Sequence, residues 1–221
     1  MNKKRGQVWI ETVVYTLIAF VMIAAVLAVA KPRIEEMQDK ATITQSIEMI
    51  KEIDGIISNV VQGGPGNKQI IEIGIKKGSL IVNSLGDELR FEMESRYKYS
   101  ELVSDEPQAE NDIGAGIKYR TEAFTGKTYR VIFTKDYDNY DLQFGGDSEA
   151  AEKEIGTTTT IHKISFLNKG NVEVGTGVSC SDSSTCTSYP EGYDSTTAKA
   201  KCVDSSCVYL SNKISIDVGF A

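Results

Sequence analysis

The sequence predicts an α+β protein in which a long N-terminal helix packs against a mostly antiparallel β head domain. Three observations lead to this prediction. Residues 8–30 are almost all apolar, residues 34–60 carry apolar side chains at helical spacing, and from residue 69 onward apolar and polar side chains alternate. The first two patterns are typical of helices and the third of half-buried strands. A hydrophobic fraction of 41% in 221 residues is enough for a folded core and argues against global disorder.

The apolar segment 8–30 is predicted to cross a membrane. It contains one charged residue, Glu11, and neither proline nor glycine. As a helix it is about 34 Å long, which exceeds the ~30 Å thickness of a hydrocarbon core. The basic residues at positions 3–5 predict a cytoplasmic N-terminus, with the rest of the chain outside. The segment is longer than the core of an ordinary secretory signal, and residues 31–33 (Lys-Pro-Arg) are a poor cleavage site for the corresponding peptidase.

The helix is predicted to continue beyond the membrane, with a kink at Pro32. Proline removes one backbone donor, and its ring crowds the preceding turn. Polar side chains, including Asp39, are expected to fill the solvent-facing surface of this part, and GGPGN at residues 63–67 to end the helix. The alternative is two separate helices broken at Lys31-Pro32. The predicted apolar stripe, which must rest on another part of the molecule, consists of Ile34, Met37, Ala41, Thr44, Ile47, Ile50, Ile53, Ile57 and Val60.

The remainder of the chain is predicted to form eight to ten strands in a sandwich-like or barrel-like head. The first strand begins at Gln69 and places Ile71, Ile73 and Ile75 on one face, and the second runs from Ser79 to Asn83. The first sheet is expected to clasp the apolar stripe of the helix. Further strands are indicated by alternation at Leu89/Phe91/Met93, Ile117/Tyr119, Tyr129/Val131/Phe133, Tyr140/Leu142/Phe144, Ile164/Phe166 and Ile214/Ile216/Val218/Phe220.

All four cysteines, Cys180, Cys186, Cys202 and Cys207, lie near the C-terminus. An even number beyond an outward-crossing segment predicts two disulfides in an oxidising exterior. The spacing contains no C-x-x-C pair, which disfavours a zinc site. Three pairings are possible. The nested pairing suits an antiparallel hairpin, and the local pairing, Cys180 with Cys186 and Cys202 with Cys207, is slightly favoured because both intervals are short and rich in Ser and Asp.

The first residues also form a motif. A short basic leader ends in Gly6, Gln7 begins the next segment, and Glu11 lies inside the apolar run. The sequence KKRG followed by QVWIETVVYTLI resembles the class III signal peptide of type IV pilin-like proteins, particularly the archaeal ones. Trp9 departs from the resemblance, because archaeal pilins often have a small residue at the third mature position. Archaellins usually lack the glutamate and carry a glycine-rich stretch instead, so the motif favours a pilin.

The resemblance implies processing and assembly. A prepilin-type signal peptidase would cut after Gly6 on the cytoplasmic side, which makes Gln7 the new N-terminus and Glu11 the fifth mature residue. The mature chain would then wait in the membrane and assemble through its N-terminal helix into a surface filament, as a homo-oligomer or with other pilin-like subunits. In a staggered bundle, Glu11 of one subunit would meet the α-amino group of Gln7 in another. The alternative is a single-pass, membrane-anchored adhesin or receptor domain that does not polymerise.

Four segments are therefore expected. Residues 1–6 form a class III leader peptide, and residues 7–31 a transmembrane and filament-core helix. Residues 32–62 form the amphipathic continuation of the helix. Residues 63–221 form an extracellular β-rich head with a disulfide-bonded C-terminal region. The expected location is the cell membrane before assembly, with a cytoplasmic N-terminus and an outside head, and afterwards an extracellular filament or the cell surface.

Composition argues against other functions. The net charge of −7 leaves no basic face for phosphates, so nucleic acid is not an expected partner. His162, the single histidine, alternates in phase with Ile164 and Phe166 and is interpreted as a strand residue rather than a catalytic base. The acidic run 136–141 lacks the spacing of a calcium-binding loop. We therefore expect neither an enzyme nor a metal or cofactor site.

Overall fold

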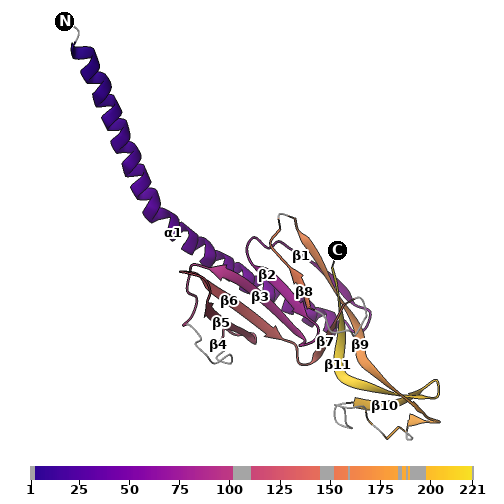
Figure 1. Cartoon of the computed structure of the whole chain (residues 1–221). Coiled ribbons are helices and arrows are strands. Elements are labelled where there is room, and N and C mark those ends of the chain that lie inside the picture. The colour runs from indigo at the N-terminus through magenta and orange to yellow at the C-terminus, as the bar shows by residue number, and fades with distance from the viewer. Residues whose placement is uncertain are drawn as a thin grey trace.

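The computed structural model describes residues 3–101, 111–144, 152–158, 160–183, 186–187, 189 and 198–220, and of residues 3–8 and 174–177 it describes the backbone only. A long N-terminal helix projects from a β head, as the sequence predicts (Figure 1). The leader residues Met1 and Asn2 lie outside the described residues.

Helix α1 runs without interruption from Lys3 to Gln62 and contains Pro32 in its interior. The alternative of two helices broken at Lys31-Pro32 is therefore wrong. The helix changes direction between the part that projects from the head and the part that packs on it (Figure 1). The helix ends where the sequence predicts. Gly63 N–H donates to the carbonyl of Asn59 over 3.0 Å, and Gly64 adopts a φ of +79°, a conformation that suits glycine after a helix C-terminus.

The packed half of α1 buries a face that differs in part from the predicted stripe. The prediction is confirmed for Ile50, Ile53, Ile57 and Val60, which are at most 1% exposed. It is wrong for Ile34, Met37, Ala41 and Thr44, which are exposed. Near the point where the helix leaves the head, the buried positions are instead Asp39, Ile43 and Ser46. Asp39 is therefore not part of the solvent-facing surface. The two sets of side chains lie on opposite sides of a helix with 3.6 residues per turn.

Eleven strands follow in the described part of the chain, somewhat more than the eight to ten predicted. All neighbouring strands pair antiparallel except β7 and β11, which pair in parallel. The strand bounds are β1 Lys68–Ile73, β2 Ser79–Asn83, β3 Glu88–Ser95, β4 Asn111–Asp112, β5 Ile117–Ala123, β6 Tyr129–Asp136, β7 Tyr140–Gln143, β8 Glu152–Ile155, β9 His162–Ser179, β10 Ala198–Val203 and β11 Ser206–Phe220.

The strands form two sheets, so the head is not a single closed barrel. The first sheet has the order β1-β9-β11-β10, with β7 also pairing with β11, and the second has the order β4-β5-β6-β3-β2-β8. The first three strands in sequence are divided between the sheets, because β1 lies in one sheet and β2 and β3 in the other. Helix α1 contacts β1 and β9 of the first sheet and β3 of the second. One hydrophobic core accordingly joins the helix to both sheets.

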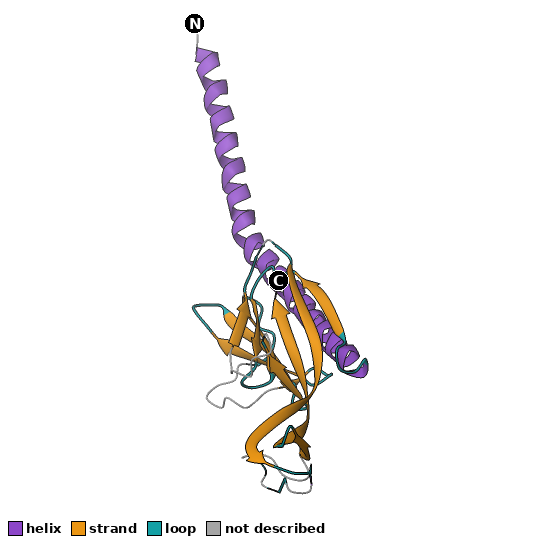
Figure 2. Cartoon of the chain, turned by 90° about the vertical axis from the view of Figure 1, so that its right-hand side faces the viewer, coloured by secondary structure: helices purple, strands orange, loops and turns teal. Residues whose placement is uncertain are grey.

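The long strands β9 and β11 extend beyond this core and, together with β10, form a second lobe. The lobe lies at the end of the molecule opposite the N-terminus in both views (Figures 1 and 2). It has its own small buried cluster, consisting of Cys186, Ala198, Cys207 and Tyr209. We call this part the disulfide lobe. The sequence predicts that its four cysteines form two disulfides, but it does not predict β10 or the first half of β11.

Candidate functional site

Most of the exposed large apolar side chains among the described residues lie on the projecting half of α1. Its window of highest mean hydropathy, 2.7, has none of its residues buried inside the protein, and the helix is long and apolar enough to cross a membrane. Burying one large apolar side chain contributes about 1.5–3 kcal/mol. This half of the helix therefore needs lipid or protein around it. The exposed large side chains are Trp9, Ile10, Val13, Val14, Tyr15, Leu17, Ile18, Phe20, Val21, Met22, Ile23, Val26, Leu27 and Val29.

Glu11 is the only charged residue of this projecting apolar surface. The hydroxyl of Tyr15, one turn further on, donates to Oε1 of Glu11 over 3.3 Å. Both side chains are on the exposed helix surface, and Tyr15 is the one hydrogen-bond partner of Glu11 among the side chains that the structure describes. Gly6 and Gln7 precede them in the same helix. The predicted processing and assembly residues thus all lie on one continuous helix.

An exposed apolar stripe continues past Pro32, on the side of α1 that faces away from the head. Ile34 is 52% exposed and Met37 is 72% exposed. Ala41 and Thr44 follow on the same side and are also exposed, and the stripe ends at Glu48. From Trp9 to Ala41 this apolar surface is about 50 Å long, whereas the hydrocarbon core of a bilayer is ~30 Å thick. Lipid tails alone therefore do not cover its full length.

Ion pairs fix the helix to the head at the point where it emerges. The carboxylate of Asp39 pairs with the ammonium of Lys77 and accepts the backbone N–H of Arg96 over 2.7 Å. The guanidinium of Arg96 contacts Glu35 at 2.6 Å. The side chain of Asp39 is only 5% exposed, so its charge depends on these partners. The direction in which α1 leaves the head is therefore fixed by specific contacts.

A second ionic contact lies further along the helix. Asp54 of α1 lies 3.5 Å from Nζ of Lys135 on β6. Burial, reinforced by the nearby carboxylate of Asp54, raises the pKa of Tyr137 above its usual range. The phenol of Tyr137 therefore stays neutral over the physiological pH range. The ion pair between Asp54 and Lys135 joins the helix to β6.

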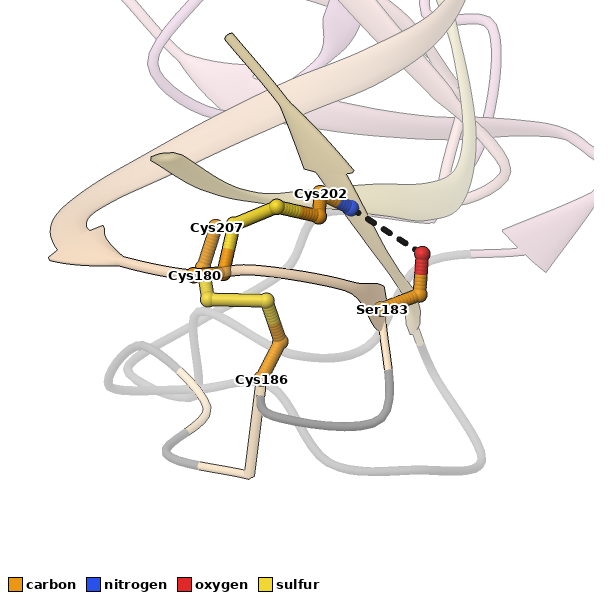
Figure 3. The surroundings of a disulfide bond; sticks show 5 residues. All are labelled: Cys180, Ser183, Cys186, Cys202 and Cys207. Atoms are coloured by element: carbon orange, nitrogen blue, oxygen red, sulfur yellow. Dashed lines mark hydrogen bonds between the residues drawn. A yellow bond between two sulfur atoms is a disulfide. The ribbon is translucent and has the colours of Figure 1, made fainter. Parts of the chain in front are cut away.

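The disulfide lobe contains two bridges, which join Cys180 to Cys202 and Cys186 to Cys207 (Figure 3). Oxidation of all four cysteines is as predicted, but the favoured local pairing is wrong, and so is the nested one. The reason lies in the topology. Cys202 and Cys207 face each other across the β10–β11 hairpin, and the segment after β9 lies against this hairpin. Each hairpin cysteine therefore bonds to a cysteine of that segment.

No catalytic arrangement is visible in the described ranges. His162 begins β9 opposite Ile73, as expected for a strand residue. Asp136, the first residue of the acidic run, pairs with Lys118 at 2.7 Å. The one group of potential metal ligands found among the described residues consists of Cys180, Cys186 and Cys207, and each of these sulfurs is already bonded in a bridge.

Comparison with protein-family models finds no match, and neither does comparison with curated proteins or with solved structures. Functional inference therefore depends on the residues themselves.

Sequence reasoning missed two residues of the helix–head junction, Asp39 and Ile43. The heptad-like spacing 39, 43, 46, 50, 53, 57, 60 was the signal that could have identified them.

Proposed function

We propose that the chain is a structural subunit of a type IV pilus-like surface filament, of the archaeal kind. The observation that carries the proposal is the apolar surface of α1, which is exposed over about 50 Å and is thus longer than a membrane core. A filament in which copies pack along this helix would cover the whole surface. A single-pass anchor would leave Ile34, Met37 and Ala41 in water.

The proposed sequence of events begins in the membrane. The subunit is inserted with its N-terminus in the cytoplasm and its head outside, and a prepilin-type signal peptidase removes residues 1–6. The mature helix, beginning at Gln7, then leaves the bilayer for a bundle of identical or related helices. The continuity of α1 from the leader to the head supports this pathway, because an uninterrupted helix carries the head along with the apolar half.

Glu11 is proposed to set the register of this bundle. A charged residue at the centre of a membrane helix costs ~2.5–3.5 kcal/mol, and less near the interface. The α-amino group of Gln7, freed by cleavage, carries a positive charge at neutral pH. A staggered neighbour can bring this amine to Glu11, and a wrong register would leave both charges unpaired. Tyr15 supplies one hydrogen bond to the carboxylate within the same helix.

The test is the N-terminal sequence of the protein recovered from cell surfaces, together with electron microscopy of the same preparation. The proposal predicts a chain that starts at Gln7 and filaments that contain it. An intact Met1, or a start beyond Ala30, would contradict pilin-type processing. A mature Gln7 terminus on material without filaments would support the peptidase step and refute polymerisation. That last result would favour the anchored adhesin.

A further inference from the structure

The two disulfides of the lobe lie next to each other. The sulfur atoms of Cys180, Cys186 and Cys207 are all within 4.8 Å of one another, although Cys180 belongs to a different bridge from the other two. Cys202, the partner of Cys180, faces Cys207 across the β10–β11 hairpin. A sulfur released from one bridge is thus already near a sulfur of the other bridge (Figure 3).

The two bridges differ in their access to solvent. Cys186 is 5% exposed and Cys207 is fully buried, whereas Cys180 and Cys202 are only half-buried. Thiol–disulfide exchange requires a thiolate to reach a sulfur of the bridge. A thiol from outside the protein therefore reaches the Cys180–Cys202 bridge before the Cys186–Cys207 bridge.

We propose that the Cys180–Cys202 bridge is a site of attack by an external thiol, and that this attack converts the crossed pairing into Cys180–Cys186 and Cys202–Cys207. The thiolate attacks Cys202, forms a mixed disulfide and releases Cys180 as a thiolate. Cys180 then attacks Cys186, which breaks the buried bridge and releases Cys207. Cys207 attacks the mixed disulfide on Cys202 and expels the external thiolate.

Atoms and electrons balance over this cycle. Two disulfides are present at the start and at the end, and the external thiol is regenerated, so it acts as a catalyst and not as a reductant. Attack on Cys180 instead of Cys202 leads to the same product. In that case the released Cys202 attacks Cys207, which faces it, and the released Cys186 then attacks the mixed disulfide on Cys180.

The fold can accommodate the product pairing. Directly opposite residues of an antiparallel pair have Cα atoms about 4.5–5.5 Å apart, which falls within the range that a disulfide spans. Their Cβ atoms, about 4.5–5.5 Å apart, need a small approach to reach the roughly 3.5–4.5 Å of a bridge. Cys202 and Cys207 can therefore bond while the β10–β11 ladder stays intact. The nested pairing would require Cys186 to bond Cys202, and these two residues are not cross-strand partners, whereas Cys202 and Cys207 are.

The exchange would change how the lobe is held. In the crossed pairing both bridges join the β10–β11 hairpin to the segment after β9, and in the product pairing neither does. The remaining links include the β9–β11 ladder and two hydrogen bonds, from Cys180 N–H to Ser205 O over 3.0 Å and from Cys202 N–H to Ser183 Oγ over 3.1 Å (Figure 3). A thiol outside the cell would thus loosen the end of the head farthest from α1, whether or not the chain polymerises.

The experiment uses the full oxidised chain in detergent micelles with a substoichiometric amount of 2-mercaptoethanol at mildly alkaline pH. Samples are quenched with acid, alkylated, digested without reduction and mapped by mass spectrometry. We expect the crossed pairing to fall and the Cys180–Cys186 and Cys202–Cys207 peptides to rise together. The number of free thiols should not exceed the amount of thiol added. Persistence of the crossed pairing alone, or equal formation of the nested pairing, would overturn the proposal.

Paired variants test the order of attack. In Cys180→Ser with Cys202→Ser, the buried Cys186–Cys207 bridge should stay intact under the same conditions. In Cys186→Ser with Cys207→Ser, the Cys180–Cys202 bridge should form mixed disulfides. The reverse order of reactivity would overturn the proposal. Because either variant can fail to fold, the wild-type time course supplies an independent readout. The first thiol adduct should appear on Cys180 or Cys202, and a first adduct on Cys186 or Cys207 would overturn the proposal as well.

Discussion

The two halves of α1 share one backbone structure and have opposite surroundings. Ile53, in the packed half, is fully buried against the head, whereas Ile23, in the projecting half, is 55% exposed. Most helical stability in folded proteins comes from the packing of an apolar face. The packed half obtains this packing from its own chain. The projecting half must obtain it from lipid or from other subunits, and this requirement is the physical basis of the proposed assembly.

The largest expected effect is that of Glu11→Gln on assembly. The neutral amide keeps its shape and can hydrogen-bond, but it cannot form an ion pair with the amine of a neighbouring Gln7. We expect normal membrane insertion and cleavage, with filaments lost or strongly reduced in electron micrographs. Glu36→Gln is the matched control, because Glu36 is a surface residue beside Arg33 in the other half of the helix, and it should leave filaments unchanged.

Abundant filaments from Glu11→Gln would refute the pairing of Glu11 with the amine. Glu11 would then keep only the weaker role of a carboxylate near a helix N-terminus, which stabilises a helix by ~0.3–1 kcal/mol.

The next largest effect is the difference in stability between two Ile→Ala variants, one in each half of the helix. Ile53→Ala removes a fully buried side chain from the main core, and we expect it to destabilise the head by about 2–5 kcal/mol. Ile23→Ala should change the free energy of unfolding of the head by no more than ~0.5 kcal/mol. Denaturant unfolding of both variants in detergent micelles measures the difference. Equal losses of stability would show that the projecting half contributes as much to the stability of the head as the packed half does.

A smaller effect is expected at the junction between the halves. Asp39→Ala leaves the part-buried N–H of Arg96 without its acceptor and Lys77 without its counter-ion, and we expect the head to lose about 1–3 kcal/mol of stability. Glu36→Ala removes an exposed ion pair with Arg33 and should cost only ~0–1 kcal/mol. Unfolding of the two variants under identical conditions compares their losses of stability. A loss at Asp39 as small as that at Glu36 would mean that the Asp39 contacts do not fix the helix to the head.

The sequence predicts much of the fold where one pattern has one explanation. The bounds of the strand Ser79–Asn83 are as predicted, and so are the shared face of Ile71, Ile73 and Ile75 and the end of the helix near residue 62. In each case a local feature, such as alternation or a glycine pair, fixes the structure without reference to distant residues.

The errors arise where the sequence carries two patterns at once. Residues 34–60 contain one apolar set that begins with Ile34 and Met37 and another that begins with Ile43 and Ile50. Helical spacing predicts both, and only the position of the two sheets decides which set is covered. The role of Asp39 depends on Lys77, which is distant in sequence. The disulfide pairing likewise depends on how the segment after β9 meets the hairpin, and cysteine spacing alone does not determine this.

The most direct test of the account is to identify what lies against the projecting half of α1 at the cell surface. A photoreactive residue at Val21, which is 67% exposed, can be activated in surface preparations and its adducts mapped by mass spectrometry. The account predicts cross-links between α1 of one copy and α1 of a neighbouring pilin-like subunit, which appear as dimers and higher multiples. Adducts with lipid alone, on a chain that stays monomeric after surface recovery, would contradict it.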